Sequence, residues 1–315
     1  MSDTLTRRNM LGRAGLVLGG AMTLGVLNAC GGDDAATPTP DPTPTPTPDA
    51  GPQVSQFPYQ QHLAADYRLD VAAIAETAYH GYYAAGCCHG AYNGLVKHLA
   101  ETAGAPFNLL ALDFGGFGGG GIAGYGSICG AVLGGVLVIN SIVPNTAPQG
   151  ATAAQSNVRN RMMVELMRWY EGFAFPRYVP ATVDAKETGL TKDFGAANLA
   201  VLQTVPGSHL CHASVTGWCA ANGNLNPNGG DKKARCARLT ADVAGKVAEM
   251  LNGYLATGAF TAETTNTTTT CVSCHGAVTS GHAAPTASGM MCQTCHAEAA
   301  HPVPHVMNSG CSDCH

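Results

Sequence analysis

The chain has 315 residues, of which 12% are charged, and its formal net charge is −5. With 16 Lys and Arg against 21 Asp and Glu, it lacks the basic surface typical of nucleic-acid-binding proteins, so we expect no nucleic-acid partner. Thirteen cysteines and twelve histidines indicate that thiol and imidazole chemistry matters more than surface charge.

Residues 1–30 have the pattern of a twin-arginine lipoprotein signal. Arg7 and Arg8 precede an apolar stretch over residues 15–27, which ends at Leu27-Asn28-Ala29-Cys30. This ending is similar to a bacterial lipobox, in which Cys30 becomes the lipidated first residue of a membrane-anchored protein. We expect export by the twin-arginine route to the periplasm or the cell surface. An uncleaved membrane anchor is the alternative, although the apolar run is short for a spanning helix.

The rest of the chain divides by composition. Residues 31–53 form a Thr/Pro-rich linker, which favours an extended tether. Residues 54–258 show helical periodicity and few strand signals, and they predict a helical domain. Residues 259–270 are a Thr-rich linker, and residues 271–315 contain no aromatic side chain except His. The expected fold class is mainly α, with a small C-terminal segment of little regular secondary structure.

Apolar periodicity predicts helices over residues 71–83, 87–102, 158–173 and 237–255. Asp70 is the expected N-cap of the first helix, and Ala72 is assigned to its apolar face. Residues 122–143 are almost wholly apolar, and we interpret them as a buried central helix and not as a membrane span. Four side chains of the 158–173 helix are assigned to the solvent side: Arg159, Arg161, Glu165 and Arg168.

Two segments of the helical domain are predicted to be irregular. The Asn- and Gly-rich residues 222–230 predict a loop. The glycine run over residues 115–121 indicates either close packing or a flexible loop, because no phosphate-binding motif surrounds it.

Three Cys-x-x-Cys-His motifs follow one another in the last 45 residues. In such a motif two thiols add to the vinyl groups of one haem, and the adjacent His binds the iron from one face. A zinc module is the alternative, but zinc sites do not require a His directly after every Cys pair. Three covalently attached haems would also form the core that this short segment lacks. The motifs are Cys271-Val272-Ser273-Cys274-His275, Cys292-Gln293-Thr294-Cys295-His296 and Cys311-Ser312-Asp313-Cys314-His315.

Each haem iron needs a second axial ligand. The C-terminal segment holds three further histidines, His282, His301 and His305, and we expect bis-His ligation of all three haem c groups. The competing ligands Met290, Met291 and Met307 would raise the reduction potential. The helical domain and a second subunit are the alternative sources of the distal ligand. The histidines of that domain are His62, His80, His89, His98, His209 and His212.

Several motifs of the helical domain resemble those of the split-Soret cytochrome c proteins, within the broader C-GCAxxG-C-C group of redox-active proteins. The resemblance covers residues 57–257, although Ala84 stands where the first Cys of the pattern would be. It implies a helical domain that holds an iron–sulfur centre, [2Fe–2S], in a homodimer. The motifs are Tyr82-Tyr83-Ala84-Ala85-Gly86-Cys87-Cys88-His89-Gly90-Ala91, Tyr125-Gly126-Ser127-Ile128-Cys129-Gly130-Ala131, Ser208-His209-Leu210-Cys211-His212, Trp218 and Arg235-Cys236.

Six cysteines are therefore candidate cluster ligands: Cys87, Cys88, Cys129, Cys211, Cys219 and Cys236. The preferred set takes Cys87 or Cys88 together with Cys129, Cys211 and Cys236, with Cys219 as a substitute. The twin-arginine route carries folded proteins, which favours a cofactor inserted before export. Structural disulfides and buried free thiols remain alternative uses of these cysteines.

These patterns predict an exported multihaem c-type cytochrome that passes electrons between redox proteins of the cell envelope, to which a lipid would anchor it. The first alternative is an oxidoreductase with a substrate site in the helical domain. The second is a redox-sensing or structural cytochrome. Electron transfer is favoured because the number of histidines leaves no haem iron open for a substrate.

Overall fold

The computed structural model describes residues 58–145 and 157–262, and within these ranges it contains helices and no strands. The mainly α fold class is thus confirmed for the described part of the chain. Two isolated antiparallel bridges, Ile128 with Leu210 and Phe175 with Thr204, join loop segments. The α-helices are α1 (Val71–Ala85), α2 (Cys87–Thr102), α3 (Gly130–Ile142), α4 (Val158–Gly172), α5 (Ala196–Leu199), α6 (Cys211–Ala221) and α7 (Gly230–Thr257). Short 3-10 helices are η2 (Tyr59–His62), η3 (Phe107–Leu109), η4 (Leu112–Gly118) and η6 (Ala200–Leu202).

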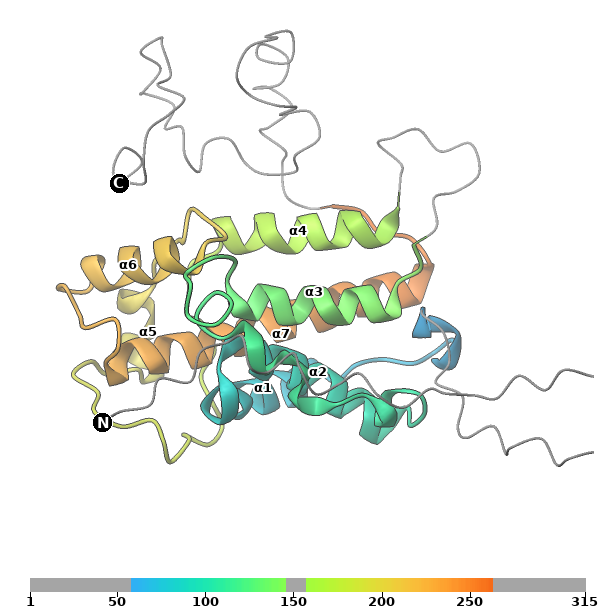
Figure 1. The fold of residues 1–315 in the computed structure, drawn as a ribbon, viewed down its shortest axis with the longest axis horizontal. Coiled ribbons are helices and arrows are strands. Elements are labelled where there is room, and N and C mark those ends of the chain that lie inside the picture. The colour runs from blue at the N-terminus through green and yellow to red at the C-terminus, as the bar shows by residue number, and fades with distance from the viewer. Residues whose placement is uncertain (1–57, 146–156, 263–315) are drawn as a thin grey trace, which may run out of the picture. The chain divides into compact units, whose positions relative to one another are not determined.

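Helix α7 organises the core, because it contacts α1, α2, α3 and α4 (Figure 1). It buries a row of small and branched apolar side chains that let its neighbours approach closely, among them Ala237, Ala241, Val247 and Leu251. Each large apolar side chain buried in this way stabilises the fold by about 1.5–3 kcal/mol. The helix ends at Gly258, whose φ of +66° suits a residue without a Cβ.

Helices α1 and α2 pack backbone against backbone. The Asp70 side chain accepts a hydrogen bond from the Ala73 N–H at 3.0 Å, which confirms the predicted N-cap. A Cβ on Gly90 would lie 2.6 Å from the Ala78 carbonyl oxygen, so only glycine allows this approach. Gly86, with φ of +90°, separates the two helices and turns the chain so that α2 can start at Cys87.

The four helices predicted by periodicity are all present, as α1, α2, α4 and α7. The observed bounds differ most from the predicted ones in α7. It begins at Gly230, seven residues before the predicted start, and the predicted loop therefore ends at Gly229. The prediction of one helix over residues 122–143 is wrong in its first part, since α3 begins only at Gly130. The preceding residues adopt left-handed backbone angles, including Ile122 at φ +61° and Ala123 at φ +52°. Among the described residues, no helix is long and apolar enough to cross a membrane.

Two predicted side-chain orientations are also wrong. Ala72 is exposed, because the buried stripe of α1 follows Ile74, Ala78 and Gly81 at one-turn intervals and Ala72 points away from it. Glu165 is 2% exposed and does not face solvent. Glu165 and Lys246 of α7 line the same cavity, so the buried carboxylate shares this cavity with a lysine side chain.

Candidate metal centre

Four cysteines from four parts of the fold come together at one end of α2, α3, α6 and α7. Cys87 is the first residue of α2, Cys129 directly precedes α3, Cys211 is the first residue of α6, and Cys236 lies near the start of α7. Every pair among them is close enough for an electrostatic interaction. We call this group the four-thiol site.

The four-thiol site is largely shielded from water. Cys87 is 8% exposed and Cys129 is 5% exposed. Burial raises the pKa of both thiols, and burial together with the neighbouring Cys129 and Cys236 raises the pKa of Cys211 to about 12. These thiols are therefore protonated at neutral pH when nothing is bound, and a metal centre would have to displace their protons.

Backbone amides point at the sulfur atoms. The Gly120 N–H interacts with Cys87, and the N–H groups of Ala131 and Val132 interact with Cys129. The approach depends on glycine, because a Cβ on Gly130 would lie 2.6 Å from the Cys87 Sγ. Gly115 and Gly118 of the glycine run over residues 115–121 also serve close packing, because a Cβ would lie 2.9 Å from the Cys88 carbonyl oxygen and 2.5 Å from the Cys88 Sγ, respectively. Hydrogen bonds to sulfur are one of the main ways in which proteins tune iron–sulfur centres.

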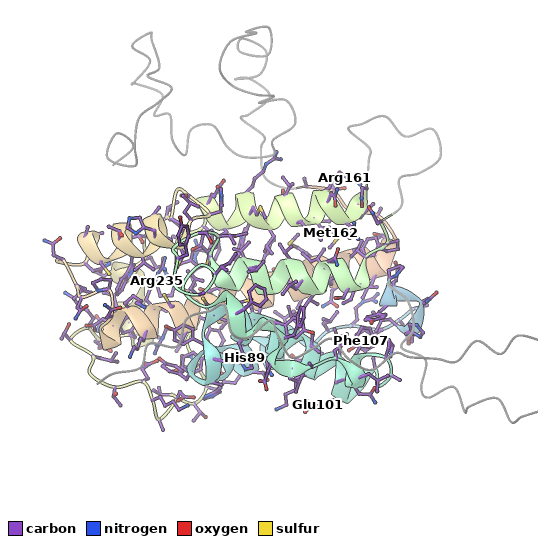
Figure 2. The ribbon with its side chains drawn as sticks, in the orientation of Figure 1. His89, Glu101, Phe107, Arg161, Met162 and Arg235 are labelled. Carbon is purple, nitrogen blue, oxygen red and sulfur yellow. The ribbon has the colours of Figure 1, made fainter. Side chains whose placement is uncertain are left out.

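Arg235, the residue before Cys236 on α7, supplies a buried positive charge to the site (Figure 2). It is 1% exposed, and its Nη1 lies 3.9 Å from the Cys236 Sγ. Burial lowers the Arg235 pKa, but the neighbouring Cys236 and Tyr170 raise it by more. Within the described residues no carboxylate forms an ion pair with it, and Asp242 acts on it only at longer range. A buried cation needs a nearby negative charge, and ionised thiols would provide one.

A hydrogen-bond network joins this cation to the opposite side of the site. The Nη2 of Arg235 donates to the Ser214 Oγ at 2.7 Å, and the hydroxyl of Tyr170 donates to the same oxygen at 2.8 Å. The Tyr170 hydroxyl also lies within hydrogen-bonding reach of Cys129. Burial raises the Tyr170 pKa, so this residue keeps its proton and acts as a fixed donor.

The other two candidate cysteines lie outside the four-thiol site. Cys88 interacts electrostatically only with Cys129, packs against Gly118 and has its pKa raised to about 11, mainly by burial. Cys219 packs beside Trp218 in a separate apolar cluster, and Cys236 is the one cysteine that influences it. All six are free thiols in the structure, which therefore contains none of the disulfides considered as an alternative.

The geometry of the four-thiol site suits a cluster better than a single ion. In residues 58–145 and 157–262, no three Cys, His, Asp or Glu side chains converge on a point where one ion could bind. A [2Fe–2S] cluster does not need such a point, because each iron takes two bridging sulfides and only two thiolates. Four thiols, backbone amides directed at sulfur and a buried compensating cation therefore fit this cofactor.

The remaining predicted site residues are placed as follows. Cys30 and the predicted haem-binding residues of the segment 271–315 lie outside the described residues. His80 lies between Glu76 and Asp184, and His209 is held by Glu171. Sequence reasoning gave no role to Arg235, Ser214 or Tyr170. The one available signal was an arginine directly before a candidate cysteine. Asp231, four residues before Arg235, is spaced to pair with it, but the Asp231 carboxylate accepts hydrogen bonds from Thr191 and Lys192 instead.

Comparisons with known proteins identify relatives of this chain. The family model of redox-active proteins designated C_GCAxxG_C_C matches residues 93–250. The split-Soret cytochrome c of Desulfovibrio desulfuricans (strain ATCC 27774 / DSM 6949 / MB) is 32% identical over 241 residues, which are 73% of this chain and 76% of the relative. A solved structure, described as a novel iron centre in the split-Soret cytochrome c from Desulfovibrio desulfuricans ATCC 27774, matches with a TM-score of 0.61 at 29% identity. That match covers 74% of this chain and 90% of the other. The chain therefore belongs to the split-Soret cytochrome c family of redox-active, electron-transfer proteins.

Proposed function

We propose that this protein is an exported multihaem c-type cytochrome that carries electrons at the cell envelope and holds a [2Fe–2S] cluster in its four-thiol site. The observation that carries the cluster proposal is Arg235, a buried cation that interacts with Cys129, Cys211 and Cys236 and, among the described residues, forms no ion pair with a carboxylate. The three Cys-x-x-Cys-His motifs carry the haem proposal, because each can attach one haem c.

The side chains around the four-thiol site have separable roles. The four thiolates would hold the cluster, which supplies one-electron redox chemistry. Arg235 offsets part of the negative charge that such a centre buries, and Ser214 fixes the orientation of its guanidinium at 2.7 Å. Tyr170, which is fully buried, closes the site beside Cys129 and keeps water from the sulfur atoms. Water exclusion and fixed dipoles are the usual means of setting a cluster potential.

Two cavities of the domain offer no substrate site at the four-thiol site. One cavity lies between α4, α7 and residues 259–261, and a second lies between α1, α2 and η4. Neither cavity is lined by a cysteine of the four-thiol site. A substrate bound in either would not reach the sulfur atoms, whereas electrons can pass through the surrounding protein.

The proposed location rests on the N-terminal sequence. The twin arginines, the lipobox-like Cys30 and the Thr/Pro linker support export and attachment to a membrane by a lipid. The partners we propose are other redox proteins of the cell envelope and a second copy of the chain in a homodimer.

The test is a cofactor count on the mature protein, purified without oxygen from a host that attaches haem c. Haem, total iron and acid-labile sulfide are measured per chain. We expect three haems, one for each motif, with about two further irons and about two sulfides. Iron equal to haem, with no sulfide, would remove the cluster and leave the cytochrome. Protein without covalent haem would refute the proposed function as a whole.

A further inference from the structure

His209 is held in the way that proteins hold a metal-binding imidazole. Its Nδ1 lies 2.8 Å from the Glu171 Oε1, and the Glu171 side chain is 2% exposed. The backbone N–H of His209 donates to the same oxygen at 3.2 Å, which fixes the ring further. A buried carboxylate on Nδ1 keeps the proton there, so that Nε2 retains its lone pair for a metal. The side chain is 23% exposed, which leaves an approach from solvent.

The other histidines of the described part of the chain lack this combination. Both ring nitrogens of His80 face carboxylates, at 3.3 Å from Glu76 and 2.7 Å from Asp184. The Nε2 of His98 accepts the Asp70 N–H at 3.2 Å. The Nε2 of His62 lies 3.4 Å from the Gln61 side-chain nitrogen, His89 is only 4% exposed, and His212 has another interaction partner.

His209 also lies directly beside the four-thiol site. Its carbonyl oxygen accepts the Cys129 N–H at 2.8 Å, and Cys211 is two residues further along the chain. An iron bound at the His209 Nε2 would therefore be linked to two of the four cysteines by a short path of covalent and hydrogen bonds. Such a position suits a redox metal that exchanges electrons with the site.

The surroundings of His209 suit a haem better than a bare ion. In the described residues no second Cys, His, Asp or Glu joins His209 to form a metal-binding group of three. Leu210, which is 39% exposed, follows His209 directly, and Tyr125, which is 89% exposed, lies at the other end of the paired segments 125–129 and 209–212. A haem brings four of its own iron ligands and an apolar surface that would cover such side chains.

The haem-carrying segment of the same chain can reach this position. From Cys236 to Thr257 the helical rise of α7 gives about 30 Å. Extended chain spans up to about 3.3 Å per residue, so a segment that returns along α7 needs about ten residues. The first haem motif begins at Cys271, fourteen residues after Thr257, and the other two lie further on.

We propose that His209 is the second axial ligand of one haem iron carried by residues 271–315, with Glu171 as its positioning residue. This inference rests on the proposed cytochrome function and adds to it. One haem would then lie next to the four-thiol site, and the remaining haems would lead electrons from it to the partner protein.

The test replaces His209 by Gly in the full-length, haem-loaded protein. We expect three attached haems, of which about one third by absorbance becomes high-spin and binds carbon monoxide. Added imidazole should restore the low-spin spectrum by occupying the vacated position. The control His62→Ala should remain fully low-spin. A His209→Gly protein with three low-spin haems that ignore carbon monoxide would overturn the inference, whereas wild-type protein without haem would overturn the proposed function instead.

Two further measurements test the inference if the His209→Gly protein cannot be produced in folded form. Glu171→Gln should keep all haems low-spin and shift the potential of one haem upward, because its axial imidazole loses an anionic partner. In the wild-type protein, diethyl pyrocarbonate should modify His209 in haem-free chains and spare it in haem-loaded chains. Equal modification of both forms, or an unchanged set of haem potentials in Glu171→Gln, would contradict haem ligation by His209.

Discussion

Replacing Arg235 by Met should change stability in opposite directions with and without the cluster. Met keeps much of the length of the side chain and removes its charge. In the cluster-loaded protein the change leaves buried negative charge without its partner, which costs about 3–5 kcal/mol of unfolding free energy. In the cluster-free protein burial raises the pKa of Cys87, Cys129 and Cys211, so these thiols are neutral and wild-type Arg235 lacks the negative charge that a cluster would bring. Its removal should then stabilise the fold by about 1–4 kcal/mol.

The same change should lower the reduction potential of the cluster. A unit charge 4 Å away contributes about 4 kcal/mol at an effective dielectric constant of about 20. The Arg235 Nη1 lies 3.9 Å from the Cys236 Sγ, while the added electron spreads over a larger volume. We therefore expect about 2–4 kcal/mol, which is roughly 90–170 mV for one electron.

The assay compares denaturant unfolding of cluster-loaded and chelator-treated protein, followed by a redox titration of the loaded form. Lys233→Met is the matched control, because it removes a positive charge from an exposed position of α7. It should change neither stability nor potential by more than about 0.5 kcal/mol. A stability change of the same sign in both forms of Arg235→Met, or an unaltered potential, would refute the role of Arg235 as counter-charge.

Three other changes test the site and its scaffold. Cys87→Ser should abolish the acid-labile sulfide of the protein, whereas Cys219→Ser should keep it; loss of sulfide in both would mean that the structure identifies the wrong ligands. Gly130→Ala should lower the unfolding free energy by about 1–3 kcal/mol in denaturant titrations, because the new Cβ would lie 2.4 Å from the Gly118 carbonyl oxygen. An unchanged midpoint would contradict this close packing. Burial raises the Glu187 pKa, but Arg238, whose Nη1 lies 2.6 Å away, and the hydroxyls of Tyr79 and Tyr83 together lower it by more. The folded-state pKa is thus below the unfolded value of about 4.3, so this stabilisation is present at neutral pH and is lost as the pH falls below about 4.3. Glu187→Gln should cost about 3–5 kcal/mol at pH 7 and show a weaker acid dependence, and equal pH profiles would refute the assignment.

The sequence predicts the helices well because their signals are local. Helix α2 runs over the predicted residues 87–102, since Gly86 sets its start and apolar spacing sets its phase. The segment before α3 was mispredicted because its composition is as apolar as a helix, and only the positions of Gly120, Gly121, Gly124 and Gly126 mark the tight turns. Apolar composition alone does not distinguish a buried helix from a loop that covers a buried site.

The ligand set was only partly predictable. Cys87 and Cys88 are adjacent in sequence, and the phase of α2 decides that Cys87 lies in the four-thiol site while Cys88 packs against Gly118. The sequence shows Arg235 directly before Cys236 but does not identify it as a counter-charge, because that role depends on which carboxylates lie near it in the folded protein. Long-range facts of this kind follow only from the assembled fold.

The central claim is that Cys87, Cys129, Cys211 and Cys236 hold an iron–sulfur cluster in a haem protein. Electron paramagnetic resonance of the chemically reduced, mature protein tests it most directly, because it detects a reduced [2Fe–2S] cluster even when haem is present. We predict a cluster signal that integrates to about one spin per chain and is lost in Cys129→Ser. Reduced wild-type protein with all its haems and no such signal would contradict the account.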